Sequence, residues 1–281
     1  ASLHSDQASL VLECRADGPP LWRHLGARVD PAGLPALADT RTLASFLLDL
    51  DAPLDTAPAV GLGWFGPSCI ALRRGGQALL LQFDAAEVLA DRTTIRIALT
   101  DPQTGITLHQ GIEMLTGGAF RFTAELVNGG AEPVAVDWLA SAIVPLSAHS
   151  AQLISWRGRH NAELVEVTEP LPQHGWLREG RRGISGHGGP PGVVVLEQGA
   201  GYHSGLVHAL QLAWSGDSRI AVERDDEGFW VLSAGAVFQP GEAVLAPGER
   251  LIAPEAILAV SDRGRNGAMT QHHAAVRAQL N

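Results

Sequence analysis

The chain reads FRFTAELV over residues 120–127, and this stretch alternates apolar and polar side chains. The first, third, fifth and seventh residues are apolar, whereas the second, fourth and sixth are Arg, Thr and Glu. A period of two places these two sets on opposite faces of an extended chain. The stretch therefore predicts a strand with one face in a core and one face in water.

Short apolar runs of this kind recur along most of the chain, and Gly, Pro, Asp and Asn separate them. These runs predict about twelve strands. The predicted strands are residues 9–14, 44–50, 78–83, 94–99, 106–114, 120–127, 134–144, 193–198, 206–214, 219–224, 229–233 and 255–260. Strands without intervening helices favour antiparallel sheets packed face to face, so the predicted fold class is all-β, a very large sandwich.

Two helices are expected beside the strands. Residues 35–43 predict a short helix, and in residues 266–280 the apolar residues Met269, Val276 and Leu280 fall at helical spacing. The predicted division is one β domain over residues 1–262 and a linker helix over 263–281, and the abrupt end of that helix suggests a connection onward.

The composition excludes several classes of partner. The 281 residues carry a net charge of −10, and all 20 basic residues are Arg. An acidic chain without a basic patch argues against nucleic acid and against anionic membranes. We see neither a membrane-length apolar run nor a signal peptide. Cys14 and Cys69 are interpreted as two free, buried thiols of a cytoplasmic protein.

No common catalytic signature is present. The sequence lacks a phosphate loop, a Gly-x-Ser-x-Gly motif and a His-Glu-x-x-His motif, and without lysine it cannot form a Schiff base. No histidine spacing suits zinc, so neither a metal nor a cofactor is expected. Asp49 with Asp51, and Asp225 with Asp226, are interpreted as turn formers. We expect no carboxyl group in an apolar setting that would raise its pKa.

Residues 156–195 are the most informative stretch for function. They are rich in Arg, His, Gly and Trp, and this composition is typical of a surface where an aromatic ring and forked donors meet a sugar. An ordered crossover whose Arg side chains anchor on carbonyls and acids explains the same composition. The candidate contact residues from this stretch are Trp156, Arg157, Arg181, Arg182 and His187.

Several segments, in this order, resemble the N-terminal domain of glycoside hydrolase family 36 α-galactosidases. They are LWRHLG at 21–26, WRGRHNAE at 156–163, PLPQHG at 170–175, RRGISGH at 181–187, WSG at 214–216, LAPGE at 245–249, APE at 253–255, SDRG at 261–264 and the histidine pair at 272–273. Gly186 and Trp214 depart from the family pattern, which has Ser and Tyr there, and leave substrate preference open.

The resemblance implies a β-supersandwich of the galactose mutarotase type. In the family this domain precedes a (β/α)8 barrel that holds both catalytic aspartates of a retaining mechanism. A barrel needs roughly 250 residues, which this chain does not have beyond the sandwich. The chain is therefore expected to be a bacterial non-catalytic domain, inactive alone, with its own catalytic barrel, a homo-oligomer and galactosides as partners.

The resemblance also implies that loops of this domain border an active site, often that of a neighbouring subunit. The best candidate is the loop at residues 60–68, where Trp64 and Phe65 stand between glycines. An exposed Trp64 would form a plate for a galactosyl unit or a partner subunit. Alternatively, Trp64 or Phe65 plugs the edge of the sandwich.

Two other functions stay open. A stand-alone aldose mutarotase needs a histidine acid and a carboxylate base, for which His160, His187 and His203 are the available histidines. The other is a carbohydrate-binding module without an enzymatic link.

Overall fold

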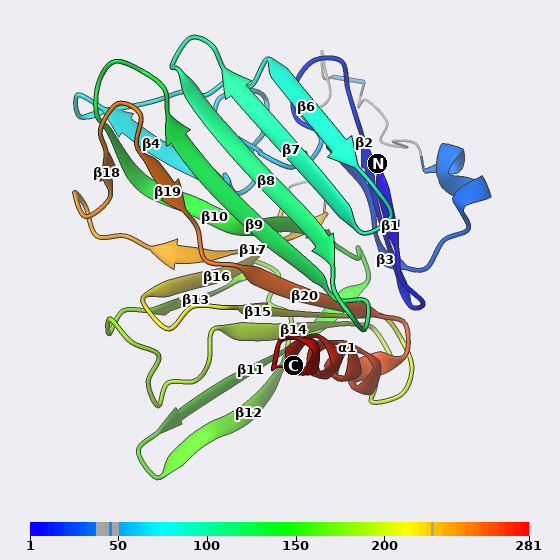
Figure 1. Cartoon of the computed structure of the whole chain (residues 1–281). Helices are drawn as coiled ribbons and strands as arrows, with labels where there is room; N and C mark the ends of the chain where they lie inside the picture. Colours follow the sequence, from blue (N-terminus) through cyan, green and yellow to red (C-terminus); the bar gives the residue numbers. More distant parts are fainter. Residues whose placement is uncertain (38–44, 47–50, 226–227, 281) are drawn as a thin grey trace.

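The computed structural model describes residues 1–37, 45–46, 51–225 and 228–280, and within them the chain forms three antiparallel sheets (Figure 1). The largest sheet has the order β12-β11-β14-β15-β20-β9-β8-β7-β6, with β19 paired to β9. Its strands are β12 (Ala162–Pro170), β11 (Ser150–Arg159), β14 (Gly192–Glu197), β15 (Val207–Leu212), β20 (Ala256–Ser261), β9 (Phe120–Asn128), β8 (Ile106–Met114), β7 (Thr94–Asp101), β6 (Ala85–Ala90) and β19 (Arg250–Ile252).

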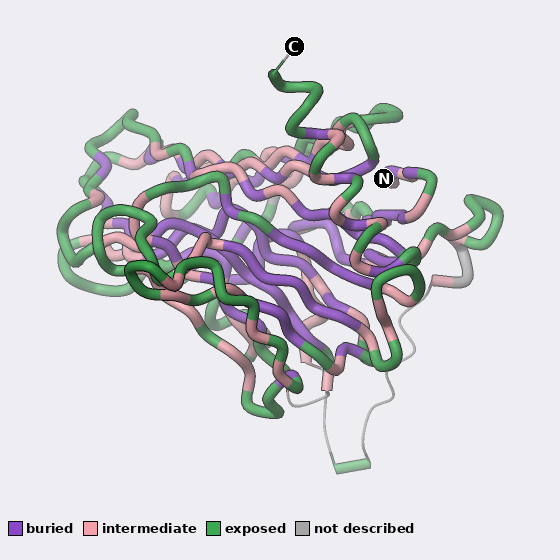
Figure 2. Tube along the Cα trace, turned by 90° about the horizontal axis from the view of Figure 1, so that it is seen from below, coloured by how far each residue is buried: buried purple, intermediate pink, exposed green. Residues whose placement is uncertain are grey.

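The second sheet has the order β13-β16-β17-β10-β4-β5, with β18 paired to β10. Its strands are β13 (Trp176–Gly180), β16 (Ser218–Arg224), β17 (Trp230–Val237), β10 (Val134–Leu146), β4 (Ile70–Arg74), β5 (Gln77–Ala78) and β18 (Val244–Leu245). One continuous core joins the facing sides of the two large sheets, and Figure 2 shows the buried residues gathered in their strands. The expected all-β sandwich is therefore confirmed.

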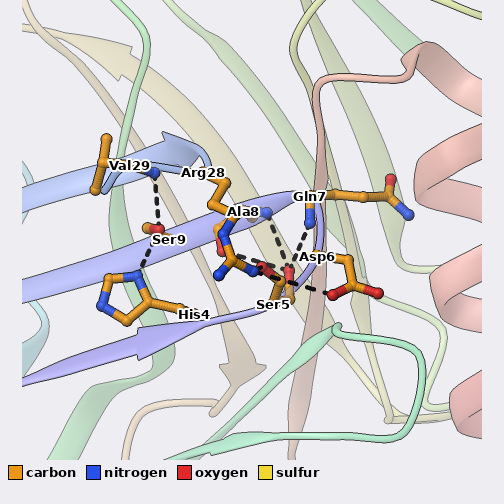
Figure 3. A network of polar contacts seen from close by, with 8 residues as sticks. All are labelled: His4, Ser5, Asp6, Gln7, Ala8, Ser9, Arg28 and Val29. Atoms are coloured by element: carbon orange, nitrogen blue, oxygen red, sulfur yellow. Dashed lines mark hydrogen bonds and ion pairs between the residues drawn. The ribbon is translucent and has the colours of Figure 1, made fainter. Parts of the chain in front are cut away.

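A third sheet of β1 (Ser2–His4), β2 (Ala8–Glu13) and β3 (Leu21–Ala27) contributes buried side chains to this core, and β3 contacts β10 and β20. A polar network secures its first turn (Figure 3). The Ser5 hydroxyl accepts from the Ala8 N–H at 3.0 Å, and Arg28 donates to the Ser5 carbonyl at 2.7 Å. The Ser9 hydroxyl lies 2.7 Å from Nδ1 of His4 and accepts from Val29 N–H. These bonds hold the amino-terminal hairpin in one register.

Strand β9 shows the alternation that its sequence predicts. Every second residue from Phe120 onward is buried and the residues between are half-buried, along a full ladder with β8 from Ile106 opposite Asn128 to Met114 opposite Phe120. Arg121 points to the outer face, where it pairs with Glu113 and with Glu255. The polar set of this stretch is thus held by surface ion pairs, while the apolar set enters the core.

Helix α1 (Gly264–Leu280) packs on the outer face of the largest sheet, against β15 and β20. Ala268, Gln271 and Ala275 are its buried side chains. Ala268 and Met269 join a second apolar cluster that includes Val207, Ala209 and Ala259 of the sheet. The expected helix at 266–280 is confirmed, and the strands beneath it are buried on both faces.

The Gln271 side chain completes the edge of β20. Strand β9 starts at Phe120, opposite Leu258, so it does not reach Val260. The Gln271 amide instead donates to the Val260 carbonyl at 2.8 Å and accepts from the Val260 N–H at 3.2 Å. A side-chain amide thereby satisfies two buried backbone groups that an adjacent strand would otherwise pair.

Several sequence predictions need correction. Residues 79–83 are not a strand, because β5 ends at Ala78, and β1, β3, β4, β6, β11, β12, β13, β18 and β19 were not predicted. A 3-10 helix, η1, spans Pro31–Ala36, while residues 38–43 of the predicted helix 35–43 lie outside the described residues. So does most of the predicted strand 44–50. β1, β18 and β19 have only two or three residues each, too few for a period of two to show. β12 is an edge strand without a buried face, so its sequence does not alternate between apolar and polar residues.

The two cysteines are unpaired, as expected, but Cys14 is exposed and only Cys69 is buried. Burial raises the pKa of the Cys69 thiol well above its usual value, and the nearby Asp55 adds to this shift. Cys69 is therefore an inert core residue. Within the described residues, no helix is both long enough and apolar enough to cross a bilayer.

Candidate functional site

A cleft of about 500 Å³ lies where β3 meets the carboxyl end of β10 and the start of β17. Its lining includes Trp22, Arg23 and His24 of β3, together with Trp64, Pro145, Glu197, Asp225, Phe229 and Trp230. Aromatic rings combined with charged and imidazole side chains are the composition expected for a small polar ligand.

Two of the aromatic rings of the cleft, those of Trp22 and Trp230, are buried. Trp22 is 9% exposed and packs at a tilt against Phe122, with the ring centroids 6.5 Å apart. Trp230 is 4% exposed, and the guanidinium of Arg224 lies 5.5 Å from its ring centroid. Little of either ring is therefore accessible to a ligand in the cleft.

The polar side chains of the cleft are tied to the protein. Arg23 donates to Glu13 at 2.5 Å, and Nε2 of His24 lies 2.8 Å from the Ala27 carbonyl. Glu197 accepts a hydrogen bond from the Ser147 hydroxyl. Such second partners fix each side chain in one orientation, which is what a pre-formed polar site requires.

The loop at residues 60–68 contributes Trp64 to the lining of this cleft. Nε1 of Trp64 donates to the Pro67 carbonyl at 2.9 Å, and a Cβ on Gly66 would collide with the Trp64 ring. The ring is half-buried and packs against the main core. Phe65, by contrast, is 78% exposed. The two adjacent aromatics thus have different surroundings, and Phe65 is the one presented to solvent.

The candidates from residues 156–187 lie far along the chain from this loop, on β11 and on the segment after β13. Trp156 is half-buried against the apolar cluster beside α1, whereas Arg157 is exposed. Arg178 donates to the carbonyls of Trp156 and Gly188, which ties the segment 181–191 to β11. His187 is exposed within that segment. Both the contact-surface and the anchored-crossover interpretations fit parts of this arrangement.

Arg181 is held by a carboxylate. Glu179, whose side chain is 8% exposed, pairs with Arg181 and with Arg219, the latter at 2.5 Å. Burial pushes the pKa of Glu179 upward, but the hydrogen bonds from these two arginines outweigh it and the pKa is lowered. Arg219 also lies over the Trp138 ring, 5.0 Å from its centroid. Arg182 is exposed. Arg181 is therefore a structural anchor as well as a candidate contact.

Most of the chain matches a known protein family. Residues 18–246 match the family model described as the glycosyl hydrolase family 36 N-terminal domain. The chain belongs to this domain family. The match covers most of the sandwich, including β3, the loop 60–68 and the segment 156–187, so the resemblance seen in the sequence is confirmed.

Two curated relatives of the family 36 domain are α-galactosidases. The chain is 26% identical over 240 residues to the α-galactosidase of Escherichia coli, which covers 85% of this chain and 34% of that protein. It is 25% identical over 186 residues to the bifunctional α-galactosidase/sucrose kinase AgaSK of Mediterraneibacter gnavus, covering 66% and 20% respectively. The chain thus spans about a third or less of the length of these curated relatives.

Solved structures share the fold of the family 36 domain. The α-galactosidase AgaA of Geobacillus stearothermophilus, in complex with stachyose, superposes with a TM-score of 0.85 at 24% identity. The superposition covers 99% of this chain and 42% of AgaA. The α-galactosidase of Lactobacillus brevis gives a TM-score of 0.82 at 20% identity, covering 96% and 40%.

The sequence did not reveal that two side chains, those of Asp55 and His208, have strongly shifted pKa values. Burial raises the pKa of Asp55 to about 7, although a hydrogen bond from Ala57 N–H and the charge of Arg15 oppose this shift. The expectation that no carboxyl group has a raised pKa was therefore wrong. Asp55 follows a loop and pairs with Leu21 of β3 in an isolated bridge, so no local pattern reveals its burial.

His208 is the second such group. It is fully buried on β15, and its Nε2 lies 3.1 Å from the Leu25 carbonyl. Burial lowers the pKa of His208 to about 4, although the hydrogen bond to Leu25 opposes the shift. His208 is a neutral core residue, whereas His203 lies in the preceding loop near α1.

Proposed function

We propose that this chain is the non-catalytic N-terminal domain of an α-galactosidase, and that the catalytic (β/α)8 barrel of that enzyme lies outside these 281 residues. The observation that carries the proposal is the family 36 N-terminal match over residues 18–246. The fold agrees with it, because 99% of this chain superposes on only 42% of AgaA. The domain would support the barrel of a retaining enzyme for terminal α-galactosides.

The carboxyl group with the most strongly raised pKa, that of Asp55, supports a role outside the chemistry. A retaining glycosidase needs a carboxyl acid of raised pKa next to a carboxylate nucleophile, both open to the sugar. Asp55 has a raised pKa but does not line the 500 Å³ cleft, and its oxygens face Ala57 N–H and Arg15. Its burial therefore explains its pKa without any catalytic role.

Purified chain tests this directly. We expect no measurable hydrolysis of p-nitrophenyl α-galactoside at protein concentrations where a complete α-galactosidase turns over readily. Robust turnover that resists further purification would contradict the proposal. The coding sequence beyond Asn281 is a second test: an aspartate-bearing barrel supports the proposal, and an immediate stop codon opposes it.

The loop at residues 60–68 is the part of the domain that we propose borders the substrate site or a neighbouring subunit of a homo-oligomer. Phe65 is 78% exposed, and a single exposed aromatic between two glycines is a typical contact residue. Trp64 stabilises the loop through the hydrogen bond that its indole N–H donates to the Pro67 carbonyl. Phe65 would therefore make the contact, and Trp64 would hold it in place.

Variants of the full-length enzyme separate the two aromatics. We expect Phe65→Ala to raise KM for raffinose roughly tenfold, about 1.4 kcal/mol, or to dissociate the oligomer in light scattering, without a loss of thermal stability. Trp64→Ala should lower both affinity and stability. Leu62→Ala, which truncates another exposed residue of the same loop, is the matched control. Unchanged KM and unchanged oligomeric state in Phe65→Ala would contradict this role.

A cytoplasmic location is also proposed. Cys14 is exposed and unpaired, and exposed free thiols persist best in a reducing compartment.

A second candidate function is sugar binding by the cleft itself. Its support is the combination of Trp64 with the oriented side chains of Arg23, His24 and Glu197 in one cavity. Calorimetric titration of the chain with raffinose tests it: saturable binding that His24→Ala weakens would favour this function. Heats equal to dilution at millimolar sugar would exclude a useful site.

A further inference from the structure

Three potential metal ligands meet on the surface of the domain. His160, Glu163 and His187 each offer one donor atom, and these atoms all lie within 4.8 Å of one another. His160 belongs to the tight turn between β11 and β12, and Glu163 begins the return along β12. His187 comes from the segment between β13 and β14, so tertiary packing alone brings it to the other two.

The turn that carries two of these ligands has a defined shape. Asn161 adopts a left-handed conformation with φ of 60°, which reverses the chain between the strands. Its N–H donates to Oε1 of Glu163 at 3.0 Å. This bond turns the Glu163 carboxylate back over the turn, toward His160, instead of leaving it extended into solvent.

The segment that carries His187 is pressed against the same hairpin. A Cβ on Gly158 would lie 2.8 Å from the His187 carbonyl, and a Cβ on Gly189 would collide with the Trp156 carbonyl. Arg178 bonds to the carbonyls on both sides of this contact, those of Trp156 and Gly188. Glycine is required at both crossings, and the backbone around His187 is thereby fixed relative to β11.

The side chains already converge. Nδ1 of His187 lies 3.2 Å from Oε1 of Glu163, and the rings of His160 and His187 lie edge to face with centroids 5.5 Å apart. Two imidazoles and one carboxylate are a common donor set for zinc, whereas calcium and magnesium prefer oxygen alone. Tetrahedral zinc places neighbouring donors roughly 3.3 Å apart, a spacing that small rotations of exposed side chains reach from the present one.

We propose that His160, Glu163 and His187 bind one zinc ion, with water in the fourth position, and that the ion fastens the tip of the β11–β12 hairpin to the segment 181–191. Sequence spacing argues against a zinc site because His187 is remote in the chain. The close backbone crossings at Gly158 and Gly189 remove that objection. The site is independent of the proposed domain role and of the cleft.

Calorimetric titration of the untagged, chelator-treated chain with ZnCl₂ tests the site. We expect one saturable site per chain, and His187→Ala should weaken it about tenfold or more because a ligand is lost. Glu163→Gln should also weaken it. His174→Ala removes another exposed histidine outside the cluster and should leave affinity unchanged.

Two further measurements distinguish a specific zinc site from nonspecific zinc binding by surface histidines. Co²⁺ bound in place of Zn²⁺ should give visible absorption bands of a four-coordinate site, and these should disappear in His187→Ala. Zn²⁺ should raise the melting temperature of the parent chain but not that of His187→Ala. Equal zinc affinity in the parent and His187→Ala, or loss of binding in His174→Ala as well, would overturn the proposal.

Discussion

The two halves of the largest sheet use the same antiparallel pairing but differ in what covers their outer face. In β9 the outer residues, among them Arg121 and Thr123, are half-exposed, and only the inner set is buried. In β15 and β20 nearly every residue is buried, because α1 packs on the outer side. Alternation in a sequence therefore reports an uncovered sheet face, and a continuous apolar run reports a covered one.

The inner face of the uncovered half should carry the largest energetic effect. Phe120 is fully buried at the start of β9. We expect Phe120→Ala to lower the free energy of unfolding by about 3–5 kcal/mol, because it removes apolar contact and leaves a cavity. Urea titration measures this, with Thr123→Ala on the outer face of the same strand as the control. Equal effects of the two substitutions would contradict the assignment of the faces.

In the covered half, His208 makes the free energy of unfolding depend on pH. Its pKa is about 4 in the folded chain, against 6.5 for an unperturbed histidine, so the unfolded chain takes up the proton first. Its contribution is present above pH 6.5 and is lost as the pH falls toward 4, by about 3 kcal/mol. We expect His208→Gln to flatten this part of the profile, measured as unfolding free energy between neutral pH and the folded-state pKa. An identical slope in both proteins would show that His208 does not titrate on unfolding.

The packing of helix α1 on β20 depends on Gln271. Gln271→Leu keeps the volume of the side chain but leaves the Val260 N–H and carbonyl without their partner. Two buried unsatisfied groups at about 1–3 kcal/mol each would cost about 2–6 kcal/mol. We expect a loss of about 2–3 kcal/mol, in the lower part of this range, because burying Leu avoids the desolvation of the Gln amide. Thr270→Ala, on the exposed side of the same turn, should change stability far less. Rapid hydrogen exchange at Val260 in Gln271→Leu would locate the effect.

The outer face of the uncovered half should give the smallest effect. Arg121 pairs with Glu113 and Glu255 at partial exposure. Because such pairs are screened by water, we expect Arg121→Ala to cost at most about 1 kcal/mol and to lose its effect in high salt. Chemical denaturation with and without about 1 M NaCl measures it. A loss as large as that of Phe120→Ala would mean that this face is covered after all.

The sequence identifies many residues of the candidate site, but it does not show how they are arranged. The pairing of Trp64 with Phe65 and the density of Arg and His after Trp156 are visible in the chain. Their surroundings are not, because the packing of Trp64 against the core and the ion pair of Arg219 with Glu179 depend on how distant segments pack on the sheets. Asp55 escaped detection for the same reason, since its burial comes from β3.

Local patterns in the chain were enough to predict the strands with clear alternation, the all-β class, the terminal helix and, through motifs in order, the family. These are local or ordered properties, and side-chain period and turn chemistry encode them directly. The folded arrangement was needed to see that α1 covers β15 and β20, that Gln271 completes β20, and that His187 meets His160 and Glu163. Contacts between distant segments depend on the packing of whole layers, which no local pattern specifies.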